Sequence, residues 1–280
     1  MPPASHPAFT PLTLRSTHLS AEVCRHGAHL FSCADSEGRP LLFLSAQSHF
    51  SDGKAIRGGV PVIAPWFGPL EDVADAPSHG LLRTLAWELL EINEASAKFG
   101  VTFPANPWWN GEAKATFSVT LDAALNISLT LQNTGERPAK IESAFHPYFA
   151  VSDIHQIRIH GLGSCDFLDK TDGMRRKTQS VEPLVLTAET DRVYPAAHGT
   201  CVIEDPAWSR RIVIEKAGSS STIVWNPWIE RSRALSDFGD DEWTGMVCVE
   251  QGNVGPDALL LLPGGSATLS TSYRLEHLES

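Results

Sequence analysis

The sequence predicts an all-β protein built as a large β-sandwich, and three observations carry that prediction. Short runs in which apolar and polar residues alternate recur along the chain, and this is the period of a half-buried strand. Clusters of Gly, Pro, Asn and Ser separate the runs, as turns do. No βαβ rhythm is visible, and no stretch carries a helical apolar stripe with a cap at each end.

Residues 117–133 give the clearest example of strand periodicity. Apolar side chains occupy one parity and mostly Ser, Thr, Asn and Gln occupy the other, so one face is expected to be buried and one wet. We expect two strands that meet near residues 122–124, or one long bent strand. The apolar parity comprises Phe117, Val119, Leu121, Leu125, Ile127, Leu129 and Leu131.

Similar short runs predict the remaining strands. They span residues 41–45, 86–92, 98–103, 156–161, 211–216, 221–226, 245–252 and 267–275. Turn residues separate several of them, at 133–136, 218–220 and 263–265. Short helical turns are expected near residues 71–77 and 231–237. No fixed repeat, low-complexity linker or change of composition interrupts the chain, so we expect a single domain over residues 1–280.

Composition and charge argue against several classes of function. The net charge of −11 is unfavourable for nucleic acid or an anionic membrane surface, although an anionic small molecule needs only a few well-placed Arg or Lys side chains. The five Cys show no CxxC spacing, which favours reduced thiols over disulfides or structural zinc. The N-terminus carries no secretory signal and the apolar runs are too short to span a membrane, so we expect a cytoplasmic protein. The oligomeric state stays open, and a monomer is compatible with the sequence.

Two segments in the first third of the chain combine residues that an ordinary strand avoids. Residues 56–69 hold six Gly and Pro among apolar residues, which predicts an irregular, tightly packed loop. Arg57 stands at its entrance and, taken alone, is most simply a solvated surface charge. His79 precedes an apolar stretch and by itself suits a turn. Arg83 lies inside that stretch, where a guanidinium usually needs an acidic or phosphate partner.

Two later segments place titratable side chains at the ends of apolar runs. His146 stands among three aromatic rings in FHPYF, residues 145–149. It is either a core imidazole bonded to a carbonyl or a proton carrier, and this segment alone does not separate the two. Glu250 ends the run VCVE and lies either at a solvated edge or in a buried position, where burial would raise its pKa toward that of a useful base. Asp191, in TDRVY, adds a second carboxylate that by itself is most simply a turn residue.

Together these groups suit proton transfer on a small polar ligand. The sequence has no Gly-rich phosphate loop between a strand and a helix, no GxSxG and no HExxH motif. No cluster of His, Cys and carboxylates has metal-ligand spacing, so we expect neither a metal nor a cofactor. Trp66, Trp225, Trp228 and Tyr148 are rings of the kind that pack on sugar faces, although such rings also fill cores.

The segments, taken in order, resemble the aldose 1-epimerase (mutarotase) superfamily, and most closely its hexose-6-phosphate mutarotase branch. RGGVPVIAPWFGP at 57–69 is similar to that branch's RGGIPxxxPxFG signature, and HGLLRTLAW at 79–87 to its HGxxRxxxW segment. FHPYF is similar to its His-plus-aromatic segment, and TDRVY, VWNPW and VEQGNV follow in the expected order. The resemblance therefore covers about residues 20–275.

The resemblance implies a large antiparallel β-supersandwich, galactose mutarotase-like, with a concave sugar site. It implies an enzyme that interconverts the α and β anomers of a hexose 6-phosphate, with glucose 6-phosphate as the expected substrate and no cofactor. The general acid falls on His146 and the general base on Glu250. The substrate-binding residues fall on Arg57, His79, Arg83 and Asp191. Two departures stand out: Pro147 replaces the usual Thr and could tilt the imidazole, and Ser78 stands where some members carry Gln.

Three alternatives remain open from the sequence. A mutarotase for unphosphorylated aldoses would use the same acid and base but would not need Arg57 and Arg83. A non-catalytic sugar-binding or regulatory protein could share the fold without the chemistry. A glycoside hydrolase that uses Glu250 and Asp191 is less favoured, because such enzymes donate the proton from a carboxylic acid and the donor candidate here is His146.

Overall fold

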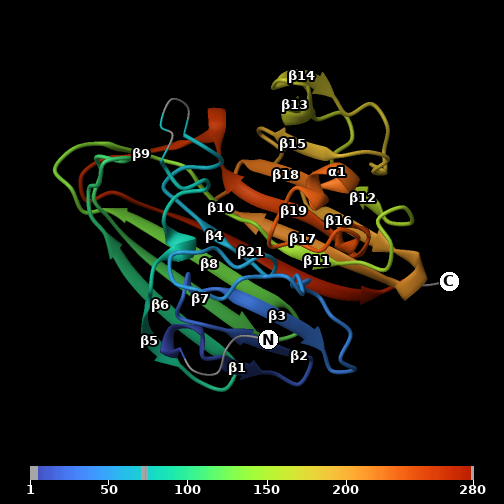
Figure 1. The fold of residues 1–280 in the computed structure, drawn as a ribbon, viewed down its shortest axis with the longest axis horizontal. Helices are drawn as coiled ribbons and strands as arrows, with labels where there is room; N and C mark the ends of the chain where they lie inside the picture. Colours follow the sequence, from blue (N-terminus) through green and yellow to red (C-terminus); the bar gives the residue numbers. More distant parts are fainter. Residues whose placement is uncertain (1–5, 71–72, 74, 279–280) are drawn as a thin grey trace.

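The computed structural model describes residues 6–70, 73 and 75–278, and nearly all of its regular structure is β. Two large antiparallel sheets pack face to face (Figure 1). We call them the front sheet and the back sheet. The all-β prediction is confirmed, and the arrangement matches the expected sandwich.

The front sheet contains eight strands and carries the predicted functional residues. Its order is β14 (Arg175–Thr178), β13 (Asp166–Asp169), β15 (Thr190–Tyr194), β18 (Ser221–Asn226), β19 (Met246–Asn253), β10 (Ser143–Phe145) and β4 (Val62–Ile63), and β11 (Tyr148–Ala150) also pairs with β19. The central strand β19 is buried at all eight positions, so both of its faces are covered.

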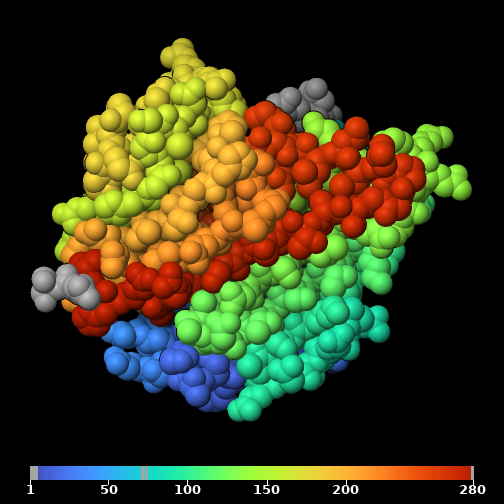
Figure 2. Space-filling model, turned by 180° about the vertical axis from the view of Figure 1, so that it is seen from behind, coloured from blue at the N-terminus to red at the C-terminus, as the bar shows by residue number. Residues whose placement is uncertain are grey.

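The back sheet also has eight strands. Its order is β12 (Arg158–His160), β16 (Cys201–Asp205), β17 (Arg210–Ala217), β21 (Ser266–His277), β8 (Leu125–Asn133), β7 (Ala113–Leu121), β6 (Ser96–Phe103) and β5 (Glu88–Ile92). In β7 and β8 burial alternates residue by residue, as the sequence pattern predicted. From behind, Figure 2 shows β21 in red running between β17 in orange and β8 in green.

The main core lies between the two sheets. Phe145 of the front sheet meets Phe117 of the back sheet edge to face, with ring centroids 6.0 Å apart. Phe149 meets Tyr273 in the same way at 5.1 Å. A third sheet of β1 (Leu12–Arg15), β2 (Leu19–Val23) and β3 (Leu30–Asp35) adds its apolar residues to the same cluster.

Short elements complete the fold. A two-stranded sheet joins β20 (Leu259–Leu261) to β9 (Ala139–Ile141). The short helices are α1 (Trp228–Arg233), η1 (Pro7–Phe9), η2 (Leu82–Thr84), η3 (Lys170–Asp172), η4 (Pro206–Trp208), η5 (Glu242–Gly245) and η6 (Gly255–Asp257). Within the described part of the chain, no helix is long and apolar enough to cross a membrane.

Two local predictions need correction. Residues 41–45 form no regular strand, because Leu42 and Leu44 make single bridges to two different segments, at Phe149 and Gly58. The helical turn expected at 231–237 is present but begins earlier, as α1. The turn expected near 71–77 includes residues 71, 72 and 74, which lie outside the described residues.

Candidate active site

One pocket on the outer face of the front sheet collects the predicted functional residues. Its volume is about 370 Å³. Its lining includes Arg57, His79, Arg83, His146, Asp191 and Glu250, together with Phe67, Lys170 and Trp225. Residues far apart in the sequence therefore meet in one cavity.

Strand register explains how the front sheet brings the two carboxylates together. Asp191 of β15 lies opposite Trp225 of β18, and Trp225 lies opposite Cys248 of β19. Glu250 follows Cys248 by two residues, and side chains two apart on a strand share a face. Asp191, Trp225 and Glu250 therefore all project from the outer face of the front sheet.

His146 and Glu250 form a close, buried pair. The distance from His146 Nε2 to Glu250 Oε1 is 3.3 Å, and the two residues are only 7% and 1% exposed. The other polar atoms of the pair, His146 Nδ1 and Glu250 Oε2, have no hydrogen-bond partner among the described residues. Buried polar atoms without partners are uncommon in proteins and each needs an explanation, of which a catalytic role is one.

Burial shifts the protonation of this pair in opposite directions. It lowers the pKa of His146 well below its usual range, and the Arg83 and Arg57 guanidinium groups lower it further. Burial also raises the pKa of Glu250 well above its usual range, and the nearby Asp191 carboxylate adds to the rise. Both shifts favour a neutral imidazole beside a protonated carboxyl, so the pair holds one proton that can move between its members.

Only one of the three aromatic neighbours of His146 holds its ring. Tyr148 stacks on the imidazole, with centroids 4.9 Å apart and planes 12° from parallel. Trp225 meets it edge-on at 5.8 Å. Phe145 and Phe149 point into the core between the sheets instead, because alternate residues of an extended segment face opposite ways. Of the three rings in residues 145–149, only that of Tyr148 therefore contacts the His146 imidazole.

The role of Pro147 follows from its place in the ladder. Phe145 pairs with Gln251 and Tyr148 with Cys248, which puts Pro147 opposite Val249 of β19. A proline has no N–H to give to the Val249 carbonyl, and the side-chain amide of Gln251 donates to that carbonyl instead. The ladder is interrupted at one residue, which separates β10 from β11.

Backbone bonds on the other side of this segment hold His146 in register. The His146 N–H donates to the Pro61 carbonyl at 3.1 Å, and the Tyr148 N–H donates to the Gly59 carbonyl at 2.8 Å. These bonds tie the imidazole to the loop at residues 56–69, which is irregular as predicted except for the two residues of β4.

His79 is held by a reciprocal pair of bonds with the same loop. Its N–H donates to the Gly68 carbonyl at 2.7 Å, and the Gly68 N–H donates to its Nδ1 at 3.2 Å. Burial and the Arg83 charge lower the pKa of His79 well below its usual range. The ring is therefore neutral with its proton on Nε2, which makes it a donor at the end away from Gly68.

The turn after His79 depends on glycine. Gly80 has a φ of 71°, and a Cβ there would lie 2.1 Å from the Ala64 carbonyl oxygen. The following Arg83 enters the pocket from η2 and donates to the Ser78 carbonyl at 2.7 Å.

The two arginines differ in how far their charge is already balanced. Arg57 contacts the Asp237 carboxylate at 3.1 Å and donates to the Tyr148 hydroxyl at 3.1 Å. Arg83 makes no ion pair with any residue in the described ranges, and burial lowers its pKa to about 10, so it is still charged at neutral pH. Of these two arginines, Arg83 is therefore the one with the greater need of an anionic ligand.

The family model described as aldose 1-epimerase matches residues 11–274. The chain belongs to the aldose 1-epimerase family. Members of that family are isomerases, and this chain is one.

Individual relatives agree with this family. A "putative glucose-6-phosphate 1-epimerase" of Cenchrus ciliaris is 34% identical over 87% of this chain and 78% of its own length. A protein of Escherichia coli K12 with the same description is 32% identical, with 83% and 79% covered. The crystal structure of a "putative mutarotase" from Salmonella typhimurium superposes with a TM-score of 0.85 at 25% identity, covering 95% of this chain and 90% of that one. The predicted family and the galactose mutarotase-like fold are thus confirmed.

Several pocket residues of this aldose 1-epimerase family member carry no signal in the sequence. Lys170 lies in a polar turn between Asp169 and Asp172, and Glu189 and Arg231 are exposed residues. Only the pairing of β13 with β15 brings Lys170 beside Asp191, at 2.9 Å. Among the described residues, no group of three or more His, Cys, Asp or Glu side chains is placed to hold a metal ion.

Proposed function

We propose that this chain interconverts the α and β anomers of a hexose 6-phosphate, with glucose 6-phosphate as the first substrate to test. The observation that carries the proposal is the buried pair of His146 and Glu250, 3.3 Å apart, in a pocket that also holds Arg57 and Arg83. The curated relatives are described by the same substrate. The cytoplasm is the expected location, since phosphorylated sugars are charged and do not cross membranes unaided.

The reaction needs two proton transfers at neighbouring oxygens. The anomeric hydroxyl and the ring oxygen are bonded to the same carbon, so the groups that serve them must also be neighbours. In the form that reacts, the one shared proton has moved from Glu250 to His146. Glu250 as carboxylate then takes the proton of the anomeric hydroxyl, and His146 as imidazolium gives its proton to the ring oxygen. The bond between C1 and the ring oxygen breaks and an open-chain aldehyde forms.

Closure reverses these steps on the other face of the aldehyde. After rotation about the C1–C2 bond, the ring hydroxyl attacks C1 while its proton returns to His146 and Glu250 protonates the new anomeric oxygen. The pair begins and ends with the same single shared proton, so no cofactor or second substrate enters the balance. Positioned acids and bases of this kind each contribute about 10²–10⁴-fold.

The cations of the pocket suit the phosphate. Guanidinium groups match phosphate oxygens as forked donors, and Arg83 has no carboxylate partner in the described chain. Arg57 already shares its charge with Asp237. We therefore assign the larger part of phosphate binding to Arg83. Asp191 would accept a hydrogen bond from a sugar hydroxyl, and His79 Nε2–H would donate one to a sugar oxygen.

Exchange spectroscopy by NMR on equilibrated glucose 6-phosphate tests the proposal directly. We expect the wild-type protein to accelerate anomer exchange above the spontaneous rate, and His146→Ala to return it to that rate. His18→Ala, at an exposed His, is the matched control and should behave as wild type.

The same measurement on free glucose distinguishes the alternatives. Equal acceleration of both sugars would favour a general aldose mutarotase. Sugar binding without acceleration would favour a non-catalytic module, and wild-type rates in His146→Ala would overturn the proposed acid.

A further inference from the structure

Lys170 stands in the pocket on a turn that is fixed at both ends. Asp169, the last residue of β13, accepts hydrogen bonds from the N–H and hydroxyl of Thr171 at 3.1 and 2.7 Å. Lys177 of β14 binds Asp169 and Asp172 at 2.8 Å each. The 3₁₀ turn η3 is therefore anchored by its own hairpin and presents Lys170 from a defined position.

The Lys170 ammonium contacts the Asp191 carboxylate and an aromatic face. Its Nζ lies 2.9 Å from Asp191 Oδ2 and 5.5 Å from the centroid of the Phe67 ring. The Phe67 ring packs edge-on against His79 at 4.7 Å, and His79 against His146 at 5.6 Å. Lys170 thus lies on the side of the pocket formed by Asp191 and Phe67.

This ion pair has a consequence for the site beyond fold stability. The Lys170 and Asp191 side chains are partly buried, 27% and 21% exposed. The pair does fix one oxygen of Asp191, which leaves the other oxygen to accept a hydrogen bond in a set direction. Lys170 also acts on Glu250: the Asp191 charge raises the pKa of Glu250, and the Lys170 charge opposes that rise.

We propose that Lys170 is a positioning residue for the sugar, which it serves by holding the Asp191 carboxylate in the orientation that receives a sugar hydroxyl. This inference rests on the proposed function only in that the ligand is a reducing sugar. Lys170 does not touch the reacting atoms, and its effect passes through Asp191.

The test compares Lys170→Met, Lys170→Arg and Asp191→Asn, alone and combined, by steady-state anomer exchange. We expect Lys170→Met to lower kcat/KM about 10-fold, mainly through KM, because the sugar loses a fixed acceptor. Lys170→Arg should recover most of the loss, since the cation is restored. In the Asp191→Asn background, Lys170→Met should change kcat/KM much less, because the ion pair is already gone.

Lys98→Met is the matched control. Lys98 also pairs with a carboxylate, Glu91 at 3.2 Å, but on the exposed surface of the back sheet. It should leave kcat and KM unchanged. Equal losses from Lys170→Met in both Asp191 backgrounds, or no rescue by Lys170→Arg, would overturn the inference.

The measurements distinguish a failure of the Lys170 inference from a failure of the proposed function. If the wild type accelerates free aldoses rather than hexose phosphates, the proposed substrate falls and the Lys170 series is measured on the free aldose. If the wild type accelerates anomer exchange but Lys170→Met is indistinguishable from it, only the Lys170 inference falls. If no sugar exchanges faster, both fall.

Discussion

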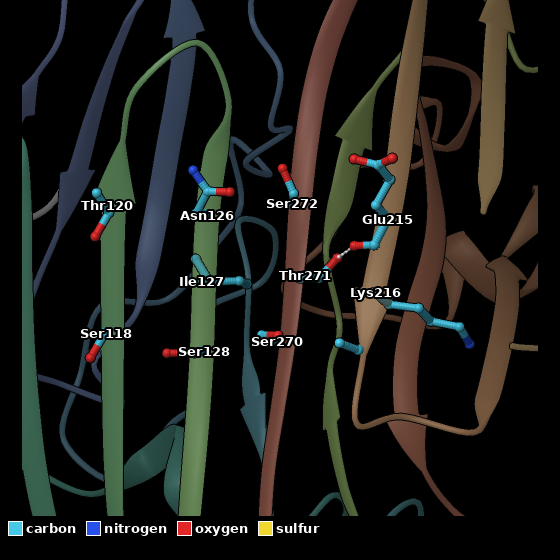
Figure 3. A pocket seen from close by; sticks show the side chains of 11 residues that line it. Ser118, Thr120, Asn126, Ile127, Ser128, Glu215, Lys216, Ser270, Thr271 and Ser272 are labelled. Carbon is cyan, nitrogen blue, oxygen red and sulfur yellow. Dashed lines mark hydrogen bonds between the residues drawn. The ribbon is translucent and has the colours of Figure 1, made fainter. Parts of the chain in front are cut away.

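The front and back sheets have similar strands and very different outer faces. On the back sheet the outward residues of three neighbouring strands form a grid of small polar side chains, and Figure 3 shows its Ser118 and Thr120 rows from close by. Its rows are Thr116, Thr130 and Thr268; Ser118, Ser128 and Ser270; and Thr120, Asn126 and Ser272. On the front sheet the corresponding face is covered, and it buries Glu250.

The outer faces of the front and back sheets carry cavities of similar size. The depression over the back-sheet grid has a volume of about 340 Å³, close to the 370 Å³ of the front pocket. The back depression has no His or Arg in its lining, and among its hydroxyl groups that of Thr271 donates to the Glu215 carbonyl. The front pocket instead holds buried titratable groups, whose charges are stabilised by neighbouring side chains rather than by water. The proposed chemistry therefore lies on the face that the loops cover, while the two inner faces that meet in the core supply stability.

The largest expected effect compares one carboxylate from each face. Glu250→Gln removes the proposed base from the front pocket, and we expect kcat for anomer exchange to fall about 10²–10⁴-fold. Glu215→Gln makes the same change in the lining of the back depression and should leave kcat unaltered. Exchange NMR on both variants measures the difference, and a comparable loss in the two would contradict the division of labour between the sheets.

The next effect concerns the phosphate and is smaller. Arg83→Met removes a guanidinium that has no ion pair among the described residues, and we expect kcat/KM for glucose 6-phosphate to fall about 10- to 100-fold, the loss of a charge-assisted hydrogen bond. The rate with free glucose should stay near the wild-type value, because a neutral sugar has no use for that charge. Arg274→Met, on β21 of the back sheet and paired with Glu276, is the matched control. An equal loss for both sugars would show that Arg83 supports the pocket rather than the phosphate.

The same contrast explains what the sequence could predict. Strands with one wet face, such as 117–133, can be recognised by their alternation, so most of the back sheet was predicted, although β16 was not. In β19 every residue is buried and alternation disappears, although its apolar run still predicted a strand at 245–252. The strand β14 consists of exposed polar residues without any apolar parity, so no pattern could reveal it.

The candidate site was predicted unevenly for a similar reason. Arg57, His79, Arg83, His146, Asp191 and Glu250 were found through family motifs, and the structure gathers them in one pocket. Lys170 has no motif, because its position depends on the long-range pairing of two hairpin strands. The stacking of Tyr148 on His146, with Phe149 facing away, was not predicted, because it depends on strand parity in the folded sheet.

The smallest expected effect tests how the front sheet tolerates Pro147 beside the proposed acid, His146. Gln251 donates to the Val249 carbonyl opposite Pro147, and its Oε1 accepts from the Tyr273 hydroxyl at 2.6 Å. Gln251→Leu leaves both groups buried without partners, so we expect the free energy of unfolding to fall by about 1–3 kcal/mol. Gln132→Leu, at an exposed position on β8, should change it by less than about 0.5 kcal/mol. Urea denaturation measures both.

A double substitution sharpens this comparison. Pro147→Thr restores a backbone N–H at the position opposite Val249, so that carbonyl regains a ladder partner. Gln251→Leu should then destabilise the protein by about 1 kcal/mol less than it does in the wild-type background. If the loss is the same in both backgrounds, Gln251 serves only Tyr273 and the packing of the core. If the loss of stability is smaller in the Pro147→Thr background, the Gln251 side chain compensates for the N–H that Pro147 lacks. The His146 imidazole then needs no tilt to stay in register with Glu250.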